Sequence, residues 1–255
     1  MTKTSYRLRA EAQFQAKRTL VAGDEPREKF YFLAARAVER YRAAFNDVYR
    51  KHVLVVGCAE GGVTPLARKG ARVVGIDISA APLTKLCAAI AKENLQTNAT
   101  VLVMDAENTA FRSGSFDIIC CSGVLHHLDV ERACRSWIRI LRPDGEVIMM
   151  EPMAWNPVVS LYRLFTPSSR TPDEHPLKPR DIRVLRKFFG QVDMTSYVLT
   201  SAVAAVWAYV PGLCPLKDRT LRILEPLDDL LLSSVPFLRY CAWTSVIRCR
   251  EPIRA

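Results

Sequence analysis

The feature that most constrains this chain is a regular alternation of short apolar runs with helical segments between residues 52 and 151. The runs are rich in Val and Ile, and three of the five end at Gly, Asp or Ser, which is typical of buried strands. They cover residues 52–57, 72–77, 100–104, 116–122 and 146–151. Strands that alternate with helices of about 10–15 residues predict an α/β fold whose parallel sheet is wound on both faces.

The two flanks differ from this central part. Apolar residues at helical spacing within residues 27–49 predict an N-terminal helical segment. After residue 152 we expect a proline-rich loop and mostly helical sequence, with a last strand near the C-terminal end. The expected elements are helices at 79–94, 133–141, 158–165 and 181–189, strands at 191–199 and 243–250, and an apolar helical insertion at about 201–238.

Composition narrows the classes of partner. The net charge is +10, with 49% hydrophobic and 24% charged residues, which excludes a disordered or fibrous chain. Basic residues are in excess in segments 1–50 and 160–190, which favours anionic partners. No nucleic-acid-binding motif accompanies this charge, so we expect no nucleic-acid partner. Eight cysteines without a CxxC pair, and an N-terminus unlike a signal peptide, predict a cytoplasmic protein.

The most informative motif is the glycine-rich turn that follows the first apolar run, Val53-Leu-Val-Val-Gly-Cys-Ala-Glu-Gly-Gly62. Glycines let a ligand approach the backbone, and the following helix offers unpaired N–H groups. Asp77 ends the next run, where a carboxylate can accept hydrogen bonds from a ribose. The turn also imitates a dinucleotide-binding fingerprint, so an NAD-dependent oxidoreductase stays an alternative at this point.

Further motifs follow in a fixed order, and with them residues 50–152 resemble the class I S-adenosylmethionine-dependent methyltransferases. Besides the turn and Asp77, the matching motifs are Asp105-Ala106, Ser115-Phe-Asp-Ile-Ile119, Leu125-His-His-Leu128 and Leu141-Arg-Pro-Asp-Gly145. The resemblance implies a Rossmann-like, doubly wound, mostly parallel seven-stranded sheet. It also implies S-adenosylmethionine as the cofactor, bound by Gly57, Ala59, Gly61, Asp77, Ile78, Asp105, Ala106 and Ser122.

The resemblance further implies a single methyltransferase domain over residues 1–255. It would comprise an N-terminal helical segment (1–50), a cofactor-binding core (51–152) and a substrate-side half (153–255). We expect O-methylation of a partly hydrophobic small molecule or a lipid-linked acceptor. The apolar insertion and the basic segments also fit peripheral contact with an anionic membrane.

Three histidines are candidates for a catalytic base. His126 and His127 follow the fourth strand, at the sheet edge where such folds bind ligands, and His175 lies on the proline-rich loop. The alternative is that these side chains only hydrogen-bond the loops around them. Asp173, Glu174 and His175 are adjacent and cannot readily converge on one ion, so the sequence predicts no metal site.

Two residues depart from the resembled family. Val55 stands where the family usually has an acid that positions the cofactor, and Ala59 stands where it usually has glycine. These departures leave open a methyltransferase-fold protein that binds the cofactor poorly or does not methylate.

Overall fold

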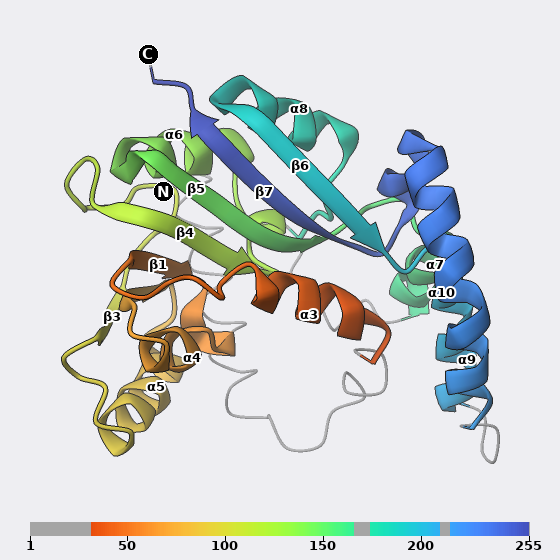
Figure 1. Cartoon of the computed structure of the whole chain (residues 1–255), viewed down its shortest axis with the longest axis horizontal. Helices are drawn as coiled ribbons and strands as arrows, with labels where there is room; N and C mark the ends of the chain where they lie inside the picture. Colours follow the sequence, from red (N-terminus) through yellow and green to blue (C-terminus); the bar gives the residue numbers. More distant parts are fainter. Residues whose placement is uncertain (1–31, 166–173, 210–214, 255) are drawn as a thin grey trace.

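In the computed structural model, which describes residues 32–165, 174–209 and 215–254, a seven-stranded sheet forms the centre of the protein (Figure 1). The strands are β1 (His52–Val56), β2 (Arg72–Asp77), β3 (Ala99–Val103), β4 (Phe116–Ser122), β5 (Leu141–Pro152), β6 (Phe189–Tyr197) and β7 (Thr244–Pro252). Their order is β3-β2-β1-β4-β5-β7-β6. Strands β1 to β5 are parallel, and β7 runs antiparallel to both of its neighbours. The predicted mostly parallel seven-stranded sheet is therefore confirmed.

Helices connect and cover these strands. They are α3 (Ala35–Ala43), α4 (Val63–Arg68), α5 (Ala80–Lys92), α6 (Val130–Ile140), α7 (Pro157–Phe165), α8 (Pro179–Phe188), α9 (Ala205–Tyr209) and α10 (Leu216–Ser234). Short 3-10 turns are η1 (Phe32–Ala34), η2 (Cys58–Glu60), η3 (Leu125–His127), η5 (Ser201–Ala204) and η6 (Pro236–Cys241). Among the described residues, no helix is both long enough and apolar enough to cross a membrane.

The core is divided by the sheet into two apolar layers. In β1, Leu54 and Val56 pack into the layer that contains α6 and α8, whereas Val53 and Val55 pack into the layer of α4 and α5. This alternation follows from the two-residue repeat of a strand. Because helices cover both faces, every position of β1 after His52 is buried, as parallel sheets require.

The ends of several helices differ from their expected positions. Helix α6 begins at Val130 because the Asp129 carboxylate accepts a hydrogen bond from the Arg132 N–H at 3.0 Å. Helix α8 begins at Pro179, with Asp181 accepting from the Lys178 N–H at 2.8 Å. Helix α5 begins at Ala80 with Ser79 at its N-cap position, but the Ser79 side chain makes no capping hydrogen bond.

The insertion between β6 and β7 lies at the sheet edge where β5 ends. Tyr197 at the end of β6 and Pro152 at the end of β5 both pair with Thr244, the first residue of β7. The chain therefore leaves and re-enters the sheet at its carboxyl edge, and α10 stands beside that edge (Figure 1). Asp228 of α10 fixes this arrangement by accepting the backbone N–H groups of residues 199–201.

The N-terminal helix is shorter than the sequence predicts. Helix α3 ends at Ala43, and residues 27–31 of the expected segment lie outside the described residues. The N-terminal end of α3 contacts the insertion, because the Arg36 guanidinium pairs with the Asp229 carboxylate of α10 at 2.7 Å. Toward its other end, Tyr41 and Phe45 pack edge to face with ring centroids 5.0 Å apart. The segment from α3 to Phe45 thus extends from the insertion to the glycine-rich turn.

Candidate ligand site at the carboxyl edge of the sheet

The glycine-rich turn after β1 combines a left-handed backbone with no room for a side chain at its first position. Gly57 has a φ of +68°, and a Cβ atom there would lie 2.3 Å from the Val124 side chain. Its N–H donates to the Ile76 carbonyl at 2.8 Å, which fixes the turn to β2. Gly61 has a φ of +115°, and a Cβ atom there would have nothing within 4 Å. The turn is therefore held against the sheet at Gly57 and is open at Gly61.

The two predicted adenosine-binding acids follow neighbouring strands. Asp77 ends β2 and is 8% exposed, with its carboxylate accepting the N–H groups of Ser79 at 2.9 Å and Ala59 at 3.1 Å. Asp105 follows β3 by two residues and accepts the Glu107 N–H at 2.8 Å. Parallel strands place both carboxylates at the same edge of the sheet, next to the glycine-rich turn.

A cavity of about 560 Å³ opens beside this turn. This volume is in the range of small-molecule and cofactor sites. The residues that line it are Val38, Tyr41, Arg42, Phe45, Val55, Val56, Gly57, Gly61, Gly62, Pro65, Leu66, Lys69, Cys120, Cys121, Ser122 and Met150. Of the predicted cofactor-binding residues, Gly57, Gly61 and Ser122 line the cavity. The other five are not part of this lining: Ala59 lies in η2, Asp77 ends β2, and Ile78, Asp105 and Ala106 lie in the loops that follow β2 and β3.

Val55 contributes an apolar side chain to the lining of the cavity. Its side chain is 4% exposed, and its Cγ1 atom lies 3.2 Å from where a Cβ on Gly62 would sit. The position where the resembled family usually has an acid therefore contributes only methyl groups. Ala59 does not line the cavity, so its methyl group does not narrow it.

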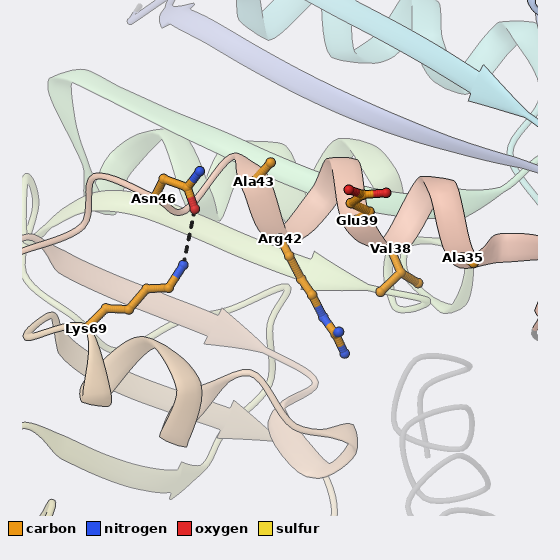
Figure 2. Close-up of a pocket in the computed structure, with 7 residues that line it drawn as sticks. All are labelled: Ala35, Val38, Glu39, Arg42, Ala43, Asn46 and Lys69. Atoms are coloured by element: carbon orange, nitrogen blue, oxygen red, sulfur yellow. Dashed lines mark hydrogen bonds between the residues drawn. The ribbon is translucent and has the colours of Figure 1, made fainter.

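Two basic side chains contribute positive charge to the lining of the cavity. Arg42 and Lys69 line it and also line a second hollow of about 580 Å³ along α3. Figure 2 shows Arg42 pointing away from α3, while the Lys69 ammonium reaches Asn46 Oδ1 at 3.4 Å. Lys69 also donates to the Phe45 carbonyl at 3.1 Å. Sequence reasoning missed Arg42 because only the packing of α3 beside the turn brings it to the cavity.

The histidine loop after β4 is built around one buried carboxylate. Glu151, at the end of β5, has no exposed surface, and its Oε2 lies 2.7 Å from His126 Nδ1. Its Oε1 accepts the N–H groups of Val124 and Leu125, both at 2.9 Å. Burial alone would raise the pKa of Glu151, but the His126 contact and the two N–H groups lower it below its ordinary value.

The ionised Glu151 determines the tautomer of His126. A carboxylate only accepts hydrogen bonds, so the Nδ1 atom of His126 carries the proton and Nε2 of the neutral ring is an acceptor. Sequence reasoning missed Glu151. The signal was present, because a charged residue ends an apolar strand at the ligand-binding edge.

The structure brings the three candidate histidines to the same place. The rings of His126 and His127 have centroids 4.2 Å apart. The His175 N–H donates to the His126 carbonyl at 2.9 Å, and the neighbouring Glu174 pairs with Arg163 at 2.7 Å. Asp173, which sequence analysis also considered, lies outside the described residues.

The cysteines beside the site are not activated. Burial raises the pKa of Cys58 to about 12, and that of Cys120 to about 12. Because the thiolate is the reactive form, these two side chains are neutral and unreactive near pH 7. The polar chemistry of the edge therefore rests on the histidines and carboxylates.

Comparison with known proteins agrees with this geometry. Residues 54–149 match the family described as methyltransferase domain. The ubiquinone biosynthesis O-methyltransferase of Sodalis glossinidius is 30% identical over 120 residues, which cover 43% of this chain and 46% of that protein. The nocamycin O-methyltransferase of Saccharothrix syringae is 36% identical over 106 residues, which cover 40% of this chain and 38% of that protein. The chain thus matches less than half the length of these two curated relatives.

Among solved structures, the geranyl diphosphate C-methyltransferase of Streptomyces coelicolor superimposes with a TM-score of 0.59. It is 14% identical, and the match covers 88% of this chain and 80% of that one. The sheet order and the cavity at the glycine-rich turn define a doubly wound α/β protein with a ligand site at its carboxyl edge. The domain match over residues 54–149 supports, together with this architecture, a relationship to the class I S-adenosylmethionine-dependent methyltransferases.

Proposed function

We propose that this protein is an S-adenosylmethionine-dependent methyltransferase that acts on an oxygen atom of a partly apolar small molecule. The observation that carries the proposal is the cavity at the glycine-rich turn, with Asp77 and Asp105 following the two neighbouring strands. Both curated relatives named above are O-methyltransferases, which supports oxygen as the acceptor atom.

The residues at the cavity fit the cofactor in shape and in charge. The open backbone at Gly61 admits a ligand, and the Asp77 and Asp105 carboxylates would hold the ribose and the adenine. Arg42 would bind the carboxylate of the methionine part, since a guanidinium forms strong charge-assisted hydrogen bonds with carboxylates. Val55 cannot replace the usual acid, so Arg42 would have the larger share in positioning that end. When bound, S-adenosylmethionine supplies an electrophilic methyl group.

The remaining task is to align the acceptor and remove its proton. Alignment supplies most of the rate in such a transfer. His126 is the proposed base, because Glu151 keeps its Nδ1 protonated and leaves Nε2 able to accept a proton. His127 and His175 are proposed to shape the same edge. Exposed apolar side chains on α7, α10 and η6, among them Leu164, Leu230 and Phe237, fit a partly apolar or lipid-like acceptor.

A thermal-unfolding panel with S-adenosylmethionine, S-adenosylhomocysteine and NAD tests this proposal. A ligand at 100 times its dissociation constant should stabilise the protein by about 2.7 kcal/mol. We expect both adenosyl ligands to do so and NAD to have no effect. Stabilisation by NAD alone would favour the oxidoreductase alternative.

Turnover requires a second measurement. Release of S-adenosylhomocysteine should be followed with a set of apolar phenols as acceptors. Binding of the cofactor without turnover of any phenol would favour the alternative of a methyltransferase-fold protein that does not methylate oxygen. Binding and turnover together would support the proposal.

A further inference from the structure

Three metal-ligating side chains meet at the histidine loop, although they come from segments almost fifty residues apart in the sequence. They are His126 and His127 of η3 and Glu174, which precedes α8, and one ligand atom of each lies within 4.8 Å of the others. Two backbone contacts hold the segment that carries Glu174 in place, one to η3 and one to the residues that follow β5. The His175 N–H donates to the His126 carbonyl at 2.9 Å, and the Ala154 N–H donates to the Leu177 carbonyl at 3.0 Å.

The surroundings of His126 match those of a metal ligand. Metal-binding histidines almost always donate their second ring N–H to a carboxylate or carbonyl, which orients the ring and makes it a stronger ligand. His126 contacts the buried Glu151 in this way at 2.7 Å through Nδ1. Its Nε2 atom is therefore the atom available to a ligand on the other side of the ring.

The local charge also favours a cation. Glu151 and Glu174 contribute two carboxylates, and Arg163 contributes one guanidinium through its 2.7 Å contact with Glu174. A carboxylate has two oxygen atoms, so Glu174 can accept from Arg163 with one of them and face the histidines with the other. With both carboxylates ionised, the two glutamates and the one arginine together carry a net charge of −1, which a bound cation would offset.

We propose that His126, His127 and Glu174 bind a divalent transition-metal ion, for which zinc is the best match. Two imidazoles and one carboxylate form a ligand set that zinc uses where a fourth position is open to water or substrate. Magnesium prefers oxygen ligands throughout. Bonds of about 2.1 Å place tetrahedral ligand atoms roughly 3.4 Å apart, so closing the site needs side-chain movements on the order of 1 Å.

The metal site and the proposed methyl transfer are separable. A cation on His126 Nε2 excludes proton transfer to the same atom. In the metal-loaded protein the cation would instead lower the pKa of the acceptor hydroxyl. This second step rests on the proposed function, whereas binding of the ion does not.

Zinc titration of the full chain tests the proposal. The protein is stripped with a chelator, and zinc or magnesium is then added in competition with a chromophoric chelator. All samples carry Cys87→Ser, because Cys87 is exposed and a cysteine thiolate is itself a zinc ligand. We expect one zinc per chain and binding of magnesium at least 100-fold weaker, consistent with the nitrogen-rich ligand set.

Single substitutions locate the ion. His127→Ala and Glu174→Gln should each weaken zinc binding by at least about 100-fold, and Glu151→Gln by about 10–100-fold. His175→Ala is the matched control, because it removes the adjacent imidazole outside the triad and should leave zinc affinity unchanged. Circular dichroism confirms that each variant is folded.

The outcomes separate the two proposals. Absence of zinc binding, or an equal loss in His175→Ala and His127→Ala, would overturn the metal site. S-adenosylhomocysteine binding is measured on the same samples. Zinc binding without binding of S-adenosylhomocysteine would refute the proposed function and support the metal site. Binding of S-adenosylhomocysteine without zinc binding would support the cofactor site and refute the metal site.

Discussion

At the scale of single residues, the site depends on carboxylates whose hydrogen bonds are mostly to backbone N–H groups. Asp77 accepts the N–H groups of Ala59 and Ser79, and Glu151 accepts those of Val124, Leu125 and His126 besides its contact with the His126 ring. Each carboxylate thus ties a loop to the end of a strand while keeping its negative charge at the ligand-binding edge. Substitutions at these positions affect both the shape of the loops and the charge that a ligand meets.

Asp77→Asn should weaken S-adenosylhomocysteine binding by about tenfold or more, since a hydrogen bond to a charged group contributes about 1.5–3 kcal/mol. Isothermal titration calorimetry measures this loss. Asp117→Asn is the control. Asp117 lies near the start of β4, at the end of the strand away from the ligand site, and its carboxylate accepts the His52 N–H at 2.7 Å. Equal affinity of the Asp77 variant and the parent protein would refute the ribose assignment.

Glu151 should make the fold sensitive to acid. Because its pKa is lowered in the folded protein, the unfolded chain binds its proton first as pH falls. The stabilisation is therefore complete above the unfolded pKa of about 4.3 and is lost as pH falls through the folded value. Urea unfolding between pH 7 and pH 3.5 should show a smaller decline in the unfolding free energy for Glu151→Gln than for the parent. A parallel decline in both proteins would contradict this role.

At the scale of elements, two anchoring contacts decide where the ligand-binding loops lie. The turn after β1 is pressed against Val124 at Gly57, and α10 is held to the end of β6 by Asp228. Both contacts join segments that are far apart in the sequence. Each can be tested against a comparable position that lacks the same contact.

Gly57→Ala should destabilise the fold by roughly 2 kcal/mol or more, because the left-handed backbone and the collision with Val124 both oppose a side chain. Gly114→Ala has the same left-handed backbone cost without the collision, since Gly114 has a φ of +66° and nothing lies within 4 Å of its Cβ position. Chemical denaturation of the two variants should therefore show the larger loss at Gly57. Equal losses would mean that contact with Val124 is unimportant.

Asp228→Ala should loosen α10 and destabilise the protein by about 3 kcal/mol, because several hydrogen bonds to one buried carboxylate are lost. The carboxylate accepts from the backbone and side chains of Thr200 and Ser201 and from the Leu199 N–H. Asp229→Ala removes only an exposed pair with Arg36 and should cost less than about 1 kcal/mol. Denaturant midpoints compare the two, and a similar cost for both would refute the anchoring role.

The sequence predicts elements better than contacts between them. Strands β1, β2 and β4 lie close to their expected positions because their apolar runs must be buried on both faces. The pairing of Glu151 with His126, the approach of Glu174 and the position of Arg42 are long-range, and no local pattern encodes them. Asp77 was recognised because its spacing from the turn is itself a local signal, whereas the role of Glu151 emerged only once β5 lay beside β4.

At the scale of the whole molecule, the carboxyl edge is divided into two regions that α3 connects. The cavity beside β1 and β4 forms the first region, and the insertion at the ends of β5 and β6 forms the second (Figure 1). Trp155, Phe237 and Tyr240 form an aromatic group in the second region, with Trp155 and Phe237 both exposed. Under the proposed function, the first region would hold the cofactor and the second would hold an apolar acceptor.

Hydrogen–deuterium exchange should resolve these regions. S-adenosylhomocysteine alone should slow exchange in the glycine-rich turn and around Tyr41, because both line the cavity. Exchange in α10 should stay unchanged, since α10 packs at the end of β6 and does not line the cavity. An apolar phenol added afterwards should slow exchange in α7 and η6, where the exposed apolar side chains would be covered. Protection of α10 by S-adenosylhomocysteine alone would show that the cofactor binds at the insertion and would exclude this division of the edge.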